Sequence, residues 1–480
     1  MTRPDERLLD TRMTEIERAH AWTPRVISKL ETLIRDGDDL SLYRINALAF
    51  ARSRAIDEAE AIDLFLYAAR HGLFEMSWDV LCPQSGMILD SFGALRTLKT
   101  HYVCGLCDVT GDTSLDDFIK VTFSVSPEIR RLAFHDPASL SVDDFHWKLH
   151  FTPDGRLPGQ SIRFIDFVQG LAKGVTYLPA QSTTRIETEL CAGALSGTNV
   201  ETQAGFVLPI AGETAATPTR LKIDYDGQRF SLGLMAVPPG RIEIEIENRG
   251  VNRGSLLLIN WPPEVVALPA KPALDFDPYV SGGMLLARQA FRRLFRSERV
   301  EEKEGLGIRQ LTFLFTDLKG STALYERLGD LNAYGLVREH FALLEATVVA
   351  SSGAVVKTIG DAVMAVFSRP ADAVTAALHI LAAIDDFNRE HGSPAIILKI
   401  GAHCGPTLAV TLNDNLDYFG QTVNVAARVQ SLAGAHEICI SESLYTSQGV
   451  REALAGHSVS SSQTHLPGVE GSACVYRIAN

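Results

Sequence analysis

The chain is 480 residues long, which is too long for one typical core and predicts two to four domains. Hydrophobic residues make up 46% of it and aromatic residues 8%, a composition that excludes a fibrous or wholly disordered protein. The formal net charge of −13 argues against broad nucleic-acid binding, because a protein neutralises phosphates with a dense basic surface.

The expected location follows from two sequence features. No uninterrupted apolar stretch approaches the length of a transmembrane helix, and the opening MTRPDERLLD has no apolar core of a signal peptide. We therefore expect a cytoplasmic protein without an integral membrane segment. The seven cysteines are scattered and odd in number, which predicts reduced thiols and not a disulfide framework.

Residues 1–110 are predicted to form a small helical cap. Between Ser41 and Gly72 apolar residues recur at helical spacing, and Gly72 is placed to end the last turn. These apolar residues are Ile62, Phe65, Leu66 and Ala69.

The cap also contains a CxxC motif, Cys104 to Cys107, with Cys82 upstream, which resembles half of a zinc ribbon. A complete ribbon has two CxxC pairs, but the residue three positions after Cys82 is Ser85. His101 is a candidate fourth ligand. Two interpretations stay open here: a structural Zn²⁺ at Cys82, Cys104 and Cys107, and a degenerate remnant without metal.

Residues 111–275 are predicted to form a mainly antiparallel β-sandwich that regulates the rest of the chain. Short apolar runs are separated by Gly and Pro, and Ile242, Ile244 and Ile246 alternate with glutamates in RIEIEIEN. This alternation places one face of a strand on a core and the other in water.

Residues 276–308 are predicted as a linker with a transducer helix, which follows the Pro-rich stretch WPPEVVALPAKPALDFDP. One apolar stripe runs along this helix at steps of three and four residues, beside several arginines. The stripe is Met284, Ala287, Phe291 and Leu294, and the arginines are Arg288, Arg292, Arg293 and Arg296. A helix docked on a neighbouring domain, a parallel dimer contact and a membrane-surface helix are the three interpretations.

From residue 309 to 480 the predicted elements alternate. QLTFLF is a strand, residues 321–351 are mainly helical, and VVKTIGDAVMAVF forms two strands around a turn at Gly360 and Asp361. ADAVTAALHILAAIDDF is a helix and AIILKIGAHCG a strand. This βαββαβ order predicts a ferredoxin-like domain and, for the whole chain, an α+β fold.

Two carboxylates at strand ends, Asp317 and Asp361, are the candidate metal ligands. Each follows an apolar strand that positions it, and each adjoins small residues that let a ligand approach the backbone. Carboxylate oxygens suit Mg²⁺, which keeps part of its coordination shell for substrate phosphates. The alternative for each aspartate alone is a turn residue bonding its own backbone.

Three motifs in this order, TFLFTDLKGST, VVKTIGDAVMAVF and DYFGQTVNVAARV, resemble the catalytic domain of class III nucleotidyl cyclases. The resemblance covers residues 309–480. It implies that the ribose 3′-hydroxyl of ATP or GTP attacks the α-phosphorus and pyrophosphate leaves. It also implies two Mg²⁺ or Mn²⁺ ions per site, held by Asp317 and Asp361.

The resemblance assigns the purine contacts to Lys357 and to Asp417. Hydrogen-bond chemistry agrees, because adenine offers an acceptor at N1 and a donor at its amino group, whereas lysine only donates and an ionised aspartate only accepts. Guanine presents a donor where adenine has its acceptor and an acceptor where adenine has its donor, so the pair favours ATP. A strand-edge lysine reaching into water is the alternative for Lys357.

Asn424 and Arg428 lie one helical turn apart, and their family counterparts orient the ribose and stabilise charge on the α-phosphate. The loop after the first metal aspartate is expected to contact the substrate; its residues are Lys319, Gly320, Ser321 and Thr322. One position departs from the family pattern, because Pro467 stands where many members have a lysine that binds the terminal phosphates. Lys319 or a backbone amide is a candidate substitute.

The sequence therefore predicts an adenylate cyclase that converts ATP to 3′,5′-cyclic AMP and pyrophosphate under the control of an N-terminal region. A catalytically silent nucleotide-binding module, suggested by Pro467, and a guanylate cyclase are the alternatives. The resemblance implies a homodimer with composite sites. Asp317 and Asp361 would come from one chain, and the purine and ribose residues from its partner.

Overall fold

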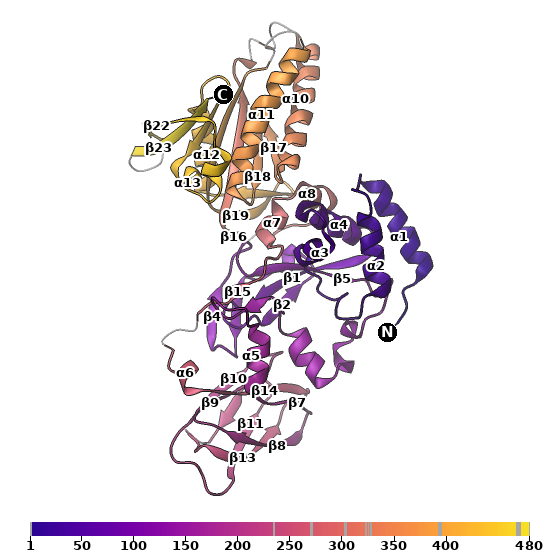
Figure 1. Cartoon of the computed structure of the whole chain (residues 1–480), viewed down its shortest axis with the longest axis vertical. Coiled ribbons are helices and arrows are strands. Elements are labelled where there is room, and N and C mark those ends of the chain that lie inside the picture. The colour runs from indigo at the N-terminus through magenta and orange to yellow at the C-terminus, as the bar shows by residue number, and fades with distance from the viewer. Residues whose placement is uncertain are drawn as a thin grey trace.

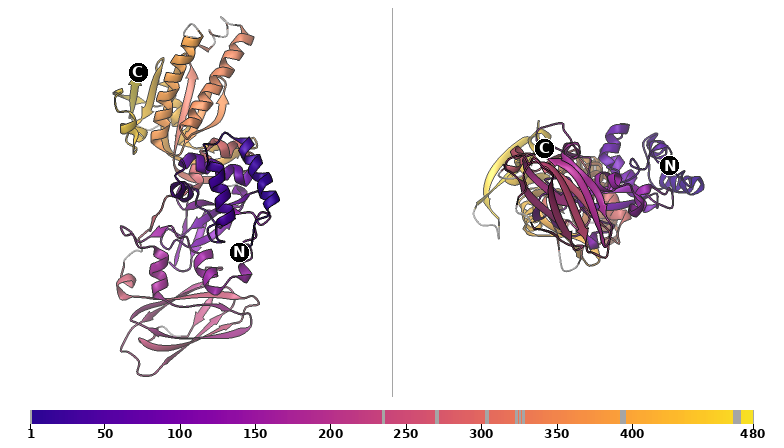
Figure 2. Two further views of the ribbon diagram at one scale, coloured as in Figure 1. Left: turned by 45° about the vertical axis from the view of Figure 1, so that its right-hand side comes forward. Right: turned by 90° about the horizontal axis from the view of Figure 1, so that it is seen from below.

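The computed structural model describes residues 2–233, 236–268, 272–301, 305–321, 324, 326, 329–391, 396–466 and 472–479. The molecule is elongated (Figures 1 and 2). A sheet covered by long helices forms one end, a sandwich of two sheets forms the other, and the N-terminal helices lie between them beside a small sheet.

The N-terminal region begins with four helices, α1 (Glu6–Ala19), α2 (Val26–Asp36), α3 (Ala47–Arg54) and α4 (Glu58–Arg70). Side-chain oxygens of Asn46 and Asp57 accept hydrogen bonds from the first amides of α3 and α4, which fixes where each helix starts. The expected helical segment from 41 to 72 is thus two helices. Gly72 follows the last turn with φ of 78°, as predicted for a helix end.

A three-stranded sheet, in the order β2-β1-β5, packs against these helices. Its strands are β1 (Phe74–Leu81), β2 (Ile88–Phe92) and β5 (Ile119–Val125). A separate hairpin, β3 (His101–Cys104) and β4 (Val109–Asp112), follows in the chain before β5. Short helical turns occupy Leu95–Thr97, Ala133–His135, Pro137–Ser139 and Asp144–Leu149.

The sandwich predicted between residues 111 and 275 is present from β7 to β14. One sheet has the order β10-β9-β14-β7 and the other the order β12-β11-β13-β8. Ile242, Ile244 and Ile246 are buried along β13, as the alternation predicts. The pairing of β11 with β13 is parallel, so the sandwich is mainly and not wholly antiparallel. The strands are β7 (Ala172–Leu178), β8 (Ser182–Leu190), β9 (Gly193–Thr198), β10 (Gly205–Ile210), β11 (Thr219–Tyr225), β12 (Phe230–Leu232), β13 (Gly240–Asn248) and β14 (Gly254–Trp261).

The linker is folded and contains two short helices where one was predicted. Helix α7 spans Gly282–Leu286 and α8 spans Gln289–Leu294, and the extended backbone of Arg288 separates them. Phe291 of α8 is buried against Trp78 of β1, so α8 is docked on the N-terminal region. Next to the linker and sandwich lie α5 (Phe164–Leu171), α6 (Pro263–Val266) and the pair β6 (Gly155–Arg156) and β15 (Asp275–Phe276).

The C-terminal part contains the predicted βαββαβ order: β16 (Leu306–Leu318), α10 (Asp330–Ala350), β17 (Ala354–Ile359), β18 (Ala362–Phe367), α11 (Pro370–Glu390) and β19 (Leu398–Leu412). The sheet continues to the order β17-β18-β16-β19-β21-β23-β22, with β20 paired to β19. The remaining elements are β20 (Asn415–Phe419), α12 (Gln421–Ser431), β21 (Glu437–Ser441), α13 (Glu442–Tyr445), α14 (Val450–Ala453), β22 (Ser458–His465) and β23 (Ser472–Ala479).

The two faces of this sheet are buried in different ways. Helices α10 and α11 cover one face (Figure 1), with Ile380 and Ile384 among the residues that pack on it. On the other face Phe313 and Phe315 belong to a hydrophobic cluster that continues through Phe291 into the N-terminal region. The N-terminal region and the C-terminal sheet therefore share one core.

Candidate active site

The structure places the two predicted metal aspartates at the same end of the C-terminal sheet. Asp317 is the penultimate residue of β16, and Asp361 lies in the turn between β17 and β18 after Gly360, whose φ is 63°. The antiparallel register that pairs Thr316 with Val363 brings the two ends together. Burial raises the pKa of Asp317, and the charge of Asp361 raises it further. A divalent cation would relieve this repulsion, and carboxylates are the ligands that Mg²⁺ and Mn²⁺ prefer.

Two residues that the sequence reasoning missed lie beside this pair. Lys399 of β19 is the cross-strand partner of Asp317, and its positive charge lowers the pKa of that carboxyl. His340 of α10 is fully buried, and neither ring nitrogen has a hydrogen-bond partner among the described residues. Burial lowers the pKa of His340 to about 4, against an opposing effect of Asp361. Neither residue belongs to one of the three motifs, so only the three-dimensional fold reveals them.

Lys357 and Asp417, the predicted purine pair, form an ion pair across the domain. Lys357 lies on β17, just after a bulge that disrupts the pairing with β18, and Asp417 lies on β20. The Lys357 side chain is 41% exposed and that of Asp417 10%. The amide of Tyr418 donates a second hydrogen bond, 2.8 Å long, to the Asp417 carboxylate. The pair thus presents one donor group and one acceptor group at a single place.

Helix α12 carries Asn424 and Arg428 on one side. Gly401 of β19 lets this helix cross the sheet closely, because a Cβ there would lie 2.1 Å from the Cα of Gln430. Asn424 is exposed and Arg428 half-buried, and neither forms a side-chain hydrogen bond or ion pair with a described residue. Both side chains are therefore available to a ligand.

The loop after Asp317 is only partly described. The amide of Lys319 donates to the carbonyl of Ile397, and Gly320 has a φ of 76°, a conformation that favours glycine. Lys319 and Gly320 are exposed and Ser321 is half-buried. Thr322 and Pro467 lie outside the described residues, so the predictions made for them stay predictions.

The linker contacts the purine pair's own strands. Arg292 of α8 donates to the carbonyl of Leu416 and lies over the ring of Tyr418, 5.7 Å from its centroid. The Tyr418 hydroxyl donates to the carbonyl of Leu286 in α7, at 3.0 Å. Gln289 accepts a 2.8 Å hydrogen bond from the amide of Val355 on β17. The linker thus contacts both neighbours of Asp417 and the residue two positions before Lys357.

The linker is tied in turn to the N-terminal helices. The Arg288 guanidinium lies 2.8 Å from the carboxylate of Asp63 in α4 and donates to the carbonyl of Ala59. Burial raises the pKa of Asp63, while the charge of Arg288 opposes that rise. These contacts connect α4 through α7 and α8 to β17 and β20.

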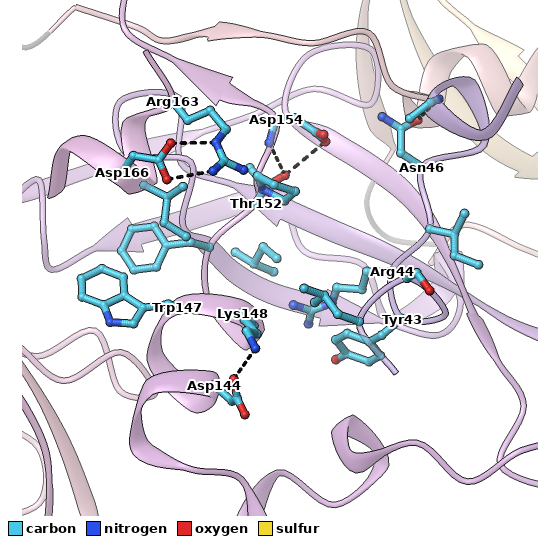
Figure 3. Close-up of a pocket in the computed structure, with 18 of the residues that line it drawn as sticks. Tyr43, Arg44, Asn46, Asp144, Trp147, Lys148, Thr152, Asp154, Arg163 and Asp166 are labelled. Carbon is cyan, nitrogen blue, oxygen red and sulfur yellow. Dashed lines mark hydrogen bonds and ion pairs between the residues drawn. The ribbon is translucent and has the colours of Figure 1, made fainter. Parts of the chain in front are cut away.

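The large cavity lies elsewhere, in the N-terminal region (Figure 3). Its volume is about 1130 Å³, and Tyr43 and Trp147 are among its aromatic residues. Its charged side chains are mostly paired with one another: Arg163 with Asp166, Lys148 with Asp144 and Lys120 with Asp154. None of the predicted catalytic residues lines it.

The structure also brings the three cysteines of the N-terminal motif together. The sulfurs of Cys82, Cys104 and Cys107 all lie within 4.8 Å of one another, and all three residues are buried. The proposal of His101 as a fourth ligand is wrong, because its side chain is 63% exposed and its Nδ1 lies 3.0 Å from Asp112. His101 points outward from β3, where it pairs across the hairpin.

Fold, motifs and site together define the C-terminal part as a class III nucleotidyl cyclase domain. A family model described as "Adenylate and Guanylate cyclase catalytic domain" matches residues 306–478. A second model matches residues 11–292, more than half of the chain, and the chain belongs to its family, described as "Family of unknown function (DUF5939)".

Curated relatives of both substrate types match the cyclase domain. An adenylate cyclase of Anabaena cylindrica is 30% identical over 151 residues, which are 28% of this chain and 30% of that protein. Guanylate cyclase 32E of Drosophila melanogaster is 28% identical over 147 residues, which are 28% of this chain and 13% of that protein. The matched segments thus span under a third of either relative, and the two differ in substrate.

Solved structures also match this part. The guanylate cyclase domain of RhGC from Catenaria anguillulae in complex with GTP is 25% identical, with a TM-score of 0.32, and the match covers 36% of this chain and 97% of that one. The adenylyl cyclase CyaB from P. aeruginosa is 20% identical, also with a TM-score of 0.32, over 37% of this chain and 96% of that one. Within the described part of the chain, no helix combines the length and apolarity needed to span a membrane.

Proposed function

We propose that the chain is an adenylate cyclase that converts ATP to 3′,5′-cyclic AMP and pyrophosphate. The ion pair of Lys357 with Asp417 is the observation that favours ATP as the substrate. When a purine opens this ion pair, the lysine can donate to adenine N1 and the aspartate can accept from the adenine amino group. Guanine presents the opposite pattern at these positions, so it would leave a donor facing a donor.

The reaction we propose exchanges one phosphorus–oxygen bond for another. The ribose 3′-oxygen bonds to the α-phosphorus and loses its proton, while the bond from that phosphorus to the pyrophosphate oxygen breaks. Asp317 and Asp361 would hold two Mg²⁺ or Mn²⁺ ions, whose chemistry is to acidify the 3′-hydroxyl and to bind the triphosphate. Arg428 would face the α-phosphate, because its fork of donors matches phosphate oxygens, and Asn424 would orient the ribose.

The working unit we propose is a homodimer. Lys357 and Asp361 lie on one tight hairpin, yet one would contact the purine and the other the metals at the opposite end of ATP. Apolar side chains near the pair support an interface, since Ile359 is 51% exposed and Phe419 is 64% exposed. Each site would combine Asp317 and Asp361 of one protomer with Lys357, Asp417, Asn424 and Arg428 of its partner.

We also propose the division of labour along the chain. Residues 309–480 would be catalytic, and residues 276–308 would transmit a signal from the region before them. The contacts of α7 and α8 with β17 and β20 support this role, because they reach both strands of the purine pair. Residues 1–110 and 111–275 would be the helical cap and the regulatory sandwich.

The test is to supply the purified full chain with Mn-ATP or Mn-GTP and to quantify the cyclic products. We expect kcat/KM to favour ATP by at least about tenfold, and Lys357→Ala or Asp417→Ala to reduce that preference. Asp414→Ala is the matched control, because its carboxylate lies near β20 but pairs with Arg299. Cyclic GMP as the main product would identify a guanylate cyclase. Nucleotide binding without any product would identify a silent module.

A further inference from the structure

The feature behind this inference is the convergence of three thiols in the N-terminal region, away from the proposed catalytic site. Cys82 directly follows β1, Cys104 is the last residue of β3, and Cys107 lies in the turn between β3 and β4. Sulfurs that only fill an apolar core have mostly carbon neighbours. Here three sulfurs from two separate turns face one another instead.

The distances match a tetrahedral metal centre. The sulfurs of Cys82 and Cys107 lie 3.9 Å apart. Two thiolates bound tetrahedrally at the usual zinc–sulfur distance of about 2.3 Å are separated by about 3.8 Å. A disulfide would need about 2.05 Å, so the observed separation suits a shared metal ion and not a bond between the two sulfurs.

Ser85 lies beside the three cysteines and is the candidate for the fourth vertex. Its hydroxyl oxygen lies 3.6 Å from the sulfur of Cys104, and the residue is 1% exposed. A zinc-bound oxygen and a zinc-bound sulfur in tetrahedral geometry are about 3.5 Å apart. Ser85 stands three residues after Cys82, where a complete ribbon has its fourth cysteine. The position that looked like a defect in the motif therefore supplies an oxygen at the distance that a ligand needs.

Both turns that carry the cysteines are held by contacts of their glycines. Gly86 has a φ of 62°, and its amide donates to the carbonyl of Cys82, which closes the first turn around the site. In the second turn a Cβ on Gly105 would lie 2.1 Å from the carbonyl oxygen of Gln203. The amide of Gly105 also donates to the Gln203 side chain. The second turn is thereby pressed against the loop that joins β9 to β10 of the sandwich.

We propose that Cys82, Cys104 and Cys107, with Ser85 at the fourth vertex, bind one structural Zn²⁺ ion. All four positions are protein atoms in a buried setting, so the site has no open position for a substrate. The ion joins the β1–β2 turn to the β3–β4 turn, which in turn contacts the sandwich. It therefore holds the middle of the molecule to its lower end in Figure 1.

The first measurement uses the full chain under reducing conditions. After dialysis without chelator, elemental analysis should find about one zinc per chain. Replacement of zinc by Co²⁺ should give thiolate-to-metal charge-transfer absorption and the intense visible bands of a tetrahedral site. The aspartates of the cyclase domain have no sulfur and cannot produce that absorption. A chain that holds no zinc and shows no charge-transfer band with Co²⁺ would overturn the proposal.

Variants assign the ligands. Cys104→Ala or Cys107→Ala should reduce the zinc content to below about a tenth of the wild-type value. Cys191→Ala is the matched control, because this thiol is exposed on the sandwich, and its zinc content should not change. Because the loss of a ligand can also unfold the region, the variant Ser85→Cys tests the site by strengthening it. It completes four thiolates and should raise the concentration of chelator needed to remove the metal by at least about tenfold. An unchanged chelator requirement would exclude Ser85 from the site.

Discussion

Asp317 lies at the end of β16 with a pKa raised first by burial and then by the charge of Asp361. Its folded-state pKa is above the ordinary value of 3.8, so the folded chain holds this proton more tightly than the unfolded chain does. Asp317 therefore lowers the free energy of unfolding as the pH rises through its folded-state pKa. This loss of stability is absent below its unfolded-state pKa. A bound divalent cation would offset it.

We expect Asp317→Asn to separate stability from activity. Cyclic AMP formation should fall at least about 100-fold, because a carboxamide is a poor ligand for Mg²⁺ or Mn²⁺. Without metal, the melting temperature of the variant should exceed that of the wild type at neutral pH, and the difference should shrink toward pH 3.8.

Asp414→Asn, on an exposed turn, is the control for both readouts. Near wild-type turnover of Asp317→Asn at saturating Mn²⁺ would show that Asp317 is not a metal ligand. A melting temperature of Asp317→Asn below that of the wild type would contradict the repulsion between Asp317 and Asp361.

The residues that the sequence identified share one property, which is membership of a contiguous motif. Asp317 and Asp361 were predicted because strand, turn and charge appear together in a short stretch, and Lys357 and Asp417 because their motifs resemble those of the cyclase family. Lys399 and His340 lie in stretches whose local pattern is that of ordinary strand and helix. Only the pairing of β16 with β19, and the packing of α10 near Asp361, bring them to the site.

At the level of elements, α8 contacts both the N-terminal region and the C-terminal sheet. It was predicted as part of a single helix from 284 to 294, because an apolar stripe fits one helix as well as two. The break falls at Arg288, whose side chain reaches Asp63 and Ala59 in α4, a contact that no local pattern encodes. The βαββαβ order was predictable because each element has its own clear periodicity.

We expect Arg292→Ala to reduce the preference for ATP over GTP. The arginine contacts the backbone of Leu416 and the ring of Tyr418, the two neighbours of Asp417, so its loss should loosen the strand that carries this proposed purine acceptor. The expected fall in the ratio of the two kcat/KM values is about three- to tenfold, as for a displaced recognition group.

Arg293→Ala is the control, because its guanidinium is 56% exposed and pairs with Glu345 of α10. A purely structural role of Arg292 would lower both kcat/KM values equally and leave their ratio unchanged. That outcome would contradict the assignment of α8 as a positioning element.

On the scale of the whole molecule, the composite sites predict complementation between inactive chains. Asp317→Ala damages the metal half of each site and Arg428→Ala the phosphate half. A mixed dimer would contain one site with both defects and one intact site, so activity should return to as much as about a quarter of the wild-type value at equal mixing. The measurement is cyclic AMP formation after subunit exchange, monitored with labelled chains. Confirmed exchange without recovery would place all these residues within one chain.

The shared core of Phe313, Phe315 and Phe291 has an evolutionary consequence. The carboxylate of Asp116 accepts hydrogen bonds from the amides of Arg309 and Gln310, and the amide of Leu115 donates to Gly307, so the start of β16 is completed by the N-terminal region. Gene fusion can join a catalytic domain to a new sensor only where the join leaves both cores intact. Here recombination near residue 300 would expose aromatic side chains on both products. The two halves of this chain are therefore expected to be inherited as a single unit.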